Sequence, residues 1–72
     1  MTRRREHGGW IIEVAPRAVG GGFRADIWLE DGQHGKVHAF HLRSTGVYAT
    51  EADTIEAGFV LGEEWINRNG PP

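Results

Sequence analysis

The C-terminal third of the chain has the clearest periodic pattern of apolar residues. Thr50 is a suitable N-cap for a helix, and Asp53 stands three residues later, where its side chain can reach back to the cap. Arg68 would lie in the last turn, and Gly70 with the two prolines after it ends the pattern. The sequence therefore predicts a helix over about residues 51–67. Its apolar face comprises residues spaced three and four apart, namely Ala52, Ile55, Phe59, Gly62 and Ile66.

Two glycines interrupt this predicted helix. Gly58 and Gly62 lie four residues apart, and a glycine in a helix interior costs up to about 1 kcal/mol relative to alanine. We therefore expect the helix to depend on close packing of its backbone against a sheet. A second row of residues, Ala57, Leu61 and Trp65, lies beside the apolar face. We expect Trp65 to wrap over the sheet edge and Leu61 to be exposed, and the alternative is that this flank contacts a partner.

The residues before the helix alternate between apolar and polar, as strands do. Strands are predicted at residues 10–14, 23–30 and 36–42, and the glycine-rich segments between them are turns. In the second strand Arg24, Asp26, Trp28 and Glu30 point to one face, and the intervening apolar residues point to the other. The third strand has two alternative orientations, because a one-residue slip exchanges the faces. Either Phe40 and Leu42 point inward, or Val37, Ala39 and His41 do.

Three successive strands with short connections favour an antiparallel meander, and the helix can cover one of its faces. We predict an α+β fold of two layers, with the order β-β-β-α. Residues 10–68 would form the single domain, residues 1–9 a disordered N-terminal arm, and residues 69–72 a short tail. The predicted core comprises Trp10, Ile12, Val14, Phe23, Ala25, Ile27, Leu29, Phe40, Leu42, Ile55, Phe59 and Ile66.

Composition limits the class of protein further. A chain of 72 residues makes one small domain, which buries only about 60% of the surface of its unfolded chain. It contains no cysteine, so neither a disulfide nor a thiolate–metal site can stabilise it. No apolar run is long enough for a signal peptide or a membrane span. We therefore expect a cytoplasmic protein.

Charge is unevenly placed along the chain, whose net charge is −2. Residues 1–9 carry three arginines against one acid, and residues 44–72 carry five acids against Arg68. Phosphate binding needs several converging cations, and here only the short arm supplies them. We expect no strong nucleic-acid binding. The alternative is a weak interaction through the open sheet face and the arginine-rich arm.

The titratable side chains form no recognisable reactive group. His34, His38 and His41 are close in sequence, but on a strand the last two point to opposite faces and cannot chelate one ion together. Glu63 and Glu64 point about 100° apart on a helix, so they are no acid–base pair. We predict no metal site, no cofactor and no catalytic residue, and therefore not an enzyme.

Protein binding remains the favoured function. Exposed apolar and aromatic side chains on the open sheet face, together with the helix flank, would form a contact surface. We interpret the protein as a non-catalytic module for protein–protein contact, and self-association as a homodimer is one form that this contact could take. The alternative is that these are scattered exposed apolar residues, which are normal on a folded protein. The candidate interaction surface comprises Ile11, Arg24, Trp28, His41, Leu61 and Trp65.

The order of these motifs also carries a resemblance. Residues 46–53 read Gly-Val-Tyr-Ala-Thr-Glu-Ala-Asp and lead into a helix closing in Glu-Trp-Ile-Asn. Over residues 9–68 the chain resembles small uncharacterised proteobacterial proteins of unknown function, which implies no activity. The matching residues are Tyr48, Thr50, Glu51, Trp65 and Ile66, whereas Asp53 and Asn67 replace the usual Ala and Asp.

A weaker likeness concerns topology alone. The AP2-type DNA-binding domains of plants also place three strands before a helix, with a similar Thr-x-x-x-Ala segment leading into it. The resemblance implies DNA contacts from arginines and tryptophans on the open sheet face. Here that face would carry Arg24 and Trp28, but also Glu13, Asp26 and Glu30.

Overall fold

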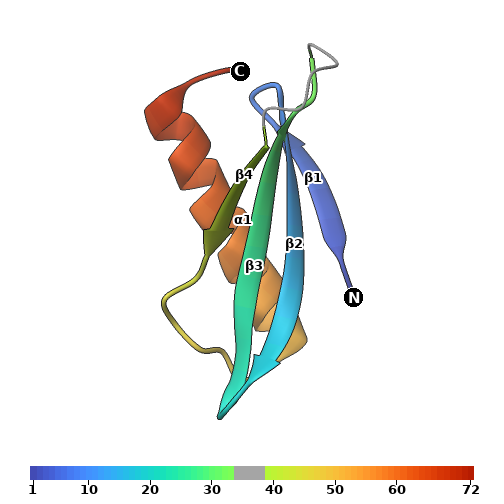
Figure 1. Ribbon diagram of the computed structural model, residues 1–72, viewed down its shortest axis with the longest axis vertical. Coiled ribbons are helices and arrows are strands. Elements are labelled where there is room, and N and C mark those ends of the chain that lie inside the picture. Colours follow the sequence, from blue (N-terminus) through green and yellow to red (C-terminus); the bar gives the residue numbers. More distant parts are fainter. Residues whose placement is uncertain (34–38) are drawn as a thin grey trace.

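The computed structural model describes residues 1–33 and 39–72. Within these residues the chain forms β1 (Arg3–His7), β2 (Trp10–Val19), β3 (Gly22–Asp31), β4 (Ala39–Arg43) and α1 (Glu51–Asn69). The strands form one antiparallel sheet in the order β1-β2-β3-β4, and α1 covers one of its faces (Figure 1). The protein is thus an α+β domain of two layers, as the pattern predicts.

The prediction of three strands was wrong, because part of the segment expected to be a disordered arm forms β1. This strand pairs with β2 from Arg3 opposite Val14 to His7 opposite Trp10. Apolar periodicity does not reveal β1, since none of its inward-facing residues, Arg3, Arg5 and His7, is apolar. The Arg5 guanidinium lies 4.2 Å from the centre of the Phe59 ring, so its stem covers the edge of the core.

The second strand is also longer than expected. β2 continues through Pro16 to Val19, paired with β3 all the way to Val19 opposite Gly22. β1 pairs with β2 only as far as Val14. Among the described residues, no strand pairs with that side of β2 at Pro16. A proline is tolerated there because its missing N–H would have no strand partner on that side.

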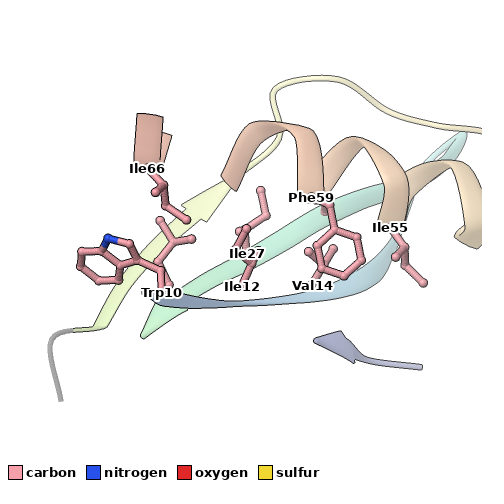
Figure 2. Close-up of a cluster of buried hydrophobic side chains, with 9 residues drawn as sticks. Trp10, Ile12, Val14, Ile27, Ile55, Phe59 and Ile66 are labelled. Atoms are coloured by element: carbon pink, nitrogen blue, oxygen red, sulfur yellow. The ribbon is translucent and has the colours of Figure 1, made fainter. Parts of the chain in front are cut away.

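The core lies between the sheet and α1, as Figure 2 shows for seven labelled side chains. Its buried members are Trp10, Ile12, Val14, Ala25, Ile27, Leu29, Ile55, Phe59 and Ile66. Ile27 lies opposite Leu42 and Leu29 opposite Phe40, so β4 turns Phe40 and Leu42 toward the helix. The flipped orientation of this strand was wrong for Ala39 and His41, and Val37 lies outside the described residues. Three predicted core residues are less buried than expected, namely Phe23, Phe40 and Leu42.

The two helix glycines allow the close packing that the sequence predicts. A Cβ on Gly58 would collide with Val14 Cγ1, and one on Gly62 would lie 2.9 Å from Ile12 Cγ2. Thr50 caps the helix by accepting a hydrogen bond from the Asp53 N–H at 3.1 Å. The helix extends to Asn69, two residues beyond the predicted end. Nowhere in the described chain is there a helix long and apolar enough to cross a membrane.

The connection between β4 and α1 follows the side of β3. Ser44 is buried, and its Oγ accepts a hydrogen bond from the Ala25 N–H at 2.9 Å. Further on, the backbones of Tyr48 and Phe23 exchange two hydrogen bonds of 2.8 Å. These bonds extend the sheet edge past the end of β4 and bring Thr50 to the position where the helix begins.

Candidate interaction surfaces

The sheet face opposite the helix is polar and carries charges of both signs. Strand register places on it four of the six predicted contact residues, namely Ile11, Arg24, Trp28 and His41. The other two, Leu61 and Trp65, lie on the helix and pack against the core from its side. The structure therefore divides the predicted surface into two separate regions, one on each layer.

Asp26 is the buried centre of the open sheet face. Only 4% of this residue is exposed. Arg17 Nε lies 3.0 Å from one carboxylate oxygen, and Arg43 Nε and His41 Nε2 both lie 3.4 Å from the other. A buried carboxylate is tolerated when such partners surround it. The pattern predicted only that Asp26 points outward, because its neighbours on β2 and β4 depend on register.

Trp28 and His41 form a stacked pair beside this carboxylate. The residues lie directly opposite one another on β3 and β4. Their ring centres are 4.9 Å apart and the ring planes are 7° from parallel. Trp28 is half-buried, while 40% of the His41 side chain is exposed. The pair forms a flat aromatic surface of the kind that protein interfaces use at their centre.

A second region is an aromatic groove at the β4 side of the helix. The groove has a volume of about 340 Å³ and is lined by Trp10, Phe40, Trp65, Asn69 and Pro72. The Trp65 ring centre lies 4.9 Å from that of Phe40 and 5.3 Å from that of Trp10. Trp10 is held in place because its Nε1–H donates a 2.9 Å hydrogen bond to the Gly70 carbonyl.

The helix flank agrees with the sequence prediction for one residue and not for the other. Trp65 is half-buried and wraps over the sheet edge, as expected. Leu61 was predicted to be exposed but is half-buried, because the oblique path of α1 brings it down onto the core. Figure 1 shows this path, with the last turns of α1 lying beyond β4.

The aromatic groove borders an edge strand of the sheet. Phe40 lines the groove, belongs to β4 and is 44% exposed. Within the described residues no strand pairs with the outer side of β4. Unpaired strand edges present free N–H and C=O groups to any extended segment that can reach them. Sequence reasoning assigned Trp10 and Phe40 to the core, and only the path of the helix shows that Phe40 is left partly uncovered.

The arginines of the predicted arm are divided between the two faces of β1. Arg5 points to the helix side, where its Nη1 lies 3.4 Å from Glu63 Oε2. Arg4 points to the open face, where its Nη2 lies 3.7 Å from Glu30 Oε2. These side chains are 45% and 58% exposed, so each pair contributes little to stability. The three arginines do not form one cationic cluster.

Metal-ligating side chains are not gathered together in the part of the chain that the structure describes. No group of three or more His, Cys, Asp or Glu residues there could hold an ion. His41 faces Asp26 and Trp28 instead. His34 and His38, which the sequence places near it, lie outside the described residues.

The chain matches no protein-family model, no curated protein and no solved structure.

Proposed function

We propose that this protein is a non-catalytic interaction module that binds an extended segment of a partner protein along the outer edge of β4. The observation that carries this proposal is the continuity of the aromatic groove with an unpaired strand edge in the described chain. In recognition by strand addition, main-chain hydrogen bonds provide affinity and a side-chain pocket provides specificity. Both elements lie side by side here, since Phe40 contributes to the groove and belongs to β4.

The size and lining of the groove support a particular class of ligand. Its volume of about 340 Å³ is at the lower end of the range of about 300–1,000 Å³ for ligand pockets. It suits one or two apolar side chains better than a large cofactor. Trp10, Phe40 and Trp65 supply aromatic surface, which dominates the binding energy of many interfaces. We therefore expect a peptide with an aromatic or branched apolar anchor. We also propose that the protein acts in the cytoplasm.

The test selects peptide ligands and then maps the site at which they bind. Peptides selected from a random display library would be titrated into isotope-labelled protein. We expect shifts in the amide signals of residues 39–43 and in the indole signals of Trp10 and Trp65. Phe40→Ser should weaken binding at least about tenfold, which corresponds to about 1.4 kcal/mol. Val60→Ser is the matched control, because Val60 is 47% exposed and does not line the groove.

Two results would contradict this proposal. In one, the selected peptides bind Phe40→Ser as tightly as the unchanged protein. In the other, the shifts are confined to Trp28, His41 and their neighbours on the open sheet face.

A weak nucleic-acid interaction is the second candidate function. It is favoured by Arg17, Arg24 and Arg43, which lie on the open face with the half-exposed Trp28. Binding of a labelled single-stranded oligonucleotide should then fall steeply between about 20 and 200 mM salt. Arg24→Gln should weaken it and Arg68→Gln, on the helix, should not. No binding at the lowest salt would exclude this function.

A further inference from the structure

The open sheet face has opposite charges at its two ends. At the hairpin end, Arg17 of β2 lies directly opposite Arg24 of β3. At the other end, Glu6 lies opposite Ile11, which in turn lies opposite Glu30. The rows between them are balanced, because Asp26 lies opposite Arg43 and Glu13 lies opposite Arg4. The described part of this face is therefore neutral in sum but strongly dipolar along its strands.

Three of these charges, Arg24, Glu6 and Glu13, make no ion pair within the described chain. Like charges directly opposite each other on a sheet are destabilising. Arg17 is relieved because its guanidinium binds Asp26. Arg24 makes no ion pair, and its Nε is buried without a hydrogen-bond partner in the described residues. At the opposite end, Glu6 also makes no ion pair with a described residue, while Glu30 is paired only with Arg4, at 3.7 Å.

This dipolar pattern is complementary to itself. A two-fold axis can lie midway between two such faces, parallel to them and perpendicular to the strands. Rotation about this axis places β3 of a second copy over β3 of the first and reverses the strand direction. If the axis passes between Asp26 and Trp28, Arg24 of each copy faces Glu30 of the other, because both lie three residues from that point. Such a contact is isologous, so every favourable pair occurs twice. A partner with an unrelated charge pattern would gain no such repetition.

We propose that two copies of this chain pack face to face through their open sheet faces, with strands antiparallel across the interface. The stacked rings of Trp28 and His41 lie next to the two-fold axis and meet their counterparts at the centre. Arg24 and Glu30 pair at both ends. The helix lies on the opposite side of each sheet, so the aromatic groove and the β4 edge stay open. This proposal concerns a different surface from the peptide site and does not depend on it.

The size of the face determines how strong such a dimer can be. The four strands contain 5, 10, 10 and 5 residues. At about 3.3 Å per residue and about 4.8 Å between strands, they present roughly 500 Å² on each copy. Two faces then bury on the order of 1,000 Å², which is near the lower limit for a specific interface. The dimer is consequently weak, concentration-dependent and sensitive to salt.

The experiment uses sedimentation and a pair of charge reversals. The mass of the unchanged protein should rise from 8.0 kDa toward twice that value as its concentration increases to about 1 mM. Arg24→Glu places Glu against Glu at both ends of the interface, and Glu30→Arg places Arg against Arg. Each variant alone should be monomeric. Their equimolar mixture should dimerise, because the mixed pair restores an opposite-charge contact.

Control variants distinguish this interface from the aromatic groove and from a loss of folding. Arg68→Glu changes a charge on the helix and should leave the dimer intact. Circular dichroism should show that both reversal variants are folded. A mass of 8.0 kDa at every concentration, or a mixture that stays monomeric, would overturn the proposal. A dimer that is lost in Phe40→Ser and kept in Arg24→Glu would assign self-association to the groove instead. Peptide binding by Arg24→Glu should be unchanged, so the two proposals can fail separately.

Discussion

At the scale of single residues, the closest contacts are made where side chains are smallest. Gly58 lies over Val14 and Ala25, and Gly62 lies over Ile12 and Leu29. Each glycine weakens the isolated helix, but its position allows the helix backbone to touch the sheet. The packing of the two layers therefore offsets the low helix propensity of these residues.

Gly58→Ala should destabilise the protein although alanine favours the helix. The gain in propensity is about 1 kcal/mol, whereas the new Cβ collides with Val14, and such overpacking typically costs about 1–3 kcal/mol. We expect a net loss of stability in urea unfolding, larger than that of Gly62→Ala, whose Cβ meets Ile12 at 2.9 Å. An increase in stability for Gly58→Ala would show that the helix lies further from the sheet.

Asp26 is the second residue whose role is defined by its neighbours. Asp26→Asn removes the charge that Arg17, Arg43 and His41 share. An ion pair with an exposed partner contributes up to about 1 kcal/mol, so the loss of the contacts to this nearly buried carboxylate should cost about 1–2 kcal/mol in all. Urea unfolding should reveal this loss, and Glu13→Gln on the same face is the control. Equal effects of the two substitutions would mean that the Asp26 cluster contributes nothing specific.

At the scale of elements, β1 shows how charged residues can build a strand. Its inward side chains cover the core edge with their stems and place their charged groups near the helix, as Arg5 does between Phe59 and Glu63. Its outward side chains lie on the open, polar face of the sheet. The strand is therefore stabilised by β2 and by the helix flank rather than by apolar residues of its own.

Arg5 and Arg4 provide a matched test of this orientation. Arg5→Ala removes the contact with the Phe59 ring and should cost about 1 kcal/mol. Arg4→Ala removes only an exposed ion pair and should change stability by less than about 0.5 kcal/mol. Urea unfolding of the two variants gives the comparison. If residues 1–9 were a disordered arm, neither substitution would have an effect.

At the scale of the whole molecule, the domain is thin, and the residues that the structure describes form one core. Its extents are 38 × 21 × 15 Å, so one layer of side chains between sheet and helix supplies nearly all of the buried apolar surface. The opposite face of the sheet carries mainly polar and charged side chains. Residues 1–33 and 39–72 form no second core that could stay folded when this one is lost.

A single cooperative transition should follow from this architecture. Trp10 lies between the layers, Trp65 packs against the side of the core, and Trp28 lies on the open face. Tryptophan fluorescence and far-ultraviolet circular dichroism should therefore give the same unfolding curve in urea, at micromolar concentration. The slope should be about 1 kcal/mol/M, as is usual for a small domain. Two separate transitions would show that the open face unfolds independently.

The local pattern of the sequence determines much of this fold. The Thr50 cap, the apolar spacing up to Ile66 and the two helix glycines specify a helix that must lie close to a sheet. The alternation from Phe23 to Glu30 specifies the two faces of β3. These features depend on contacts between residues near one another in the chain, which is why residue spacing reveals them.

Only the tertiary structure decides which residues meet. β1 forms because it pairs with β2 and contacts Phe59, and no apolar periodicity in its own sequence predicts it. Register brings Asp26 to Arg17 and Arg43, and it stacks Trp28 on His41. The oblique path of the helix covers Leu61 and leaves Phe40 exposed. Spacing alone specifies which face a side chain takes, whereas register and helix path, which depend on contacts distant in sequence, decide what lies beside it.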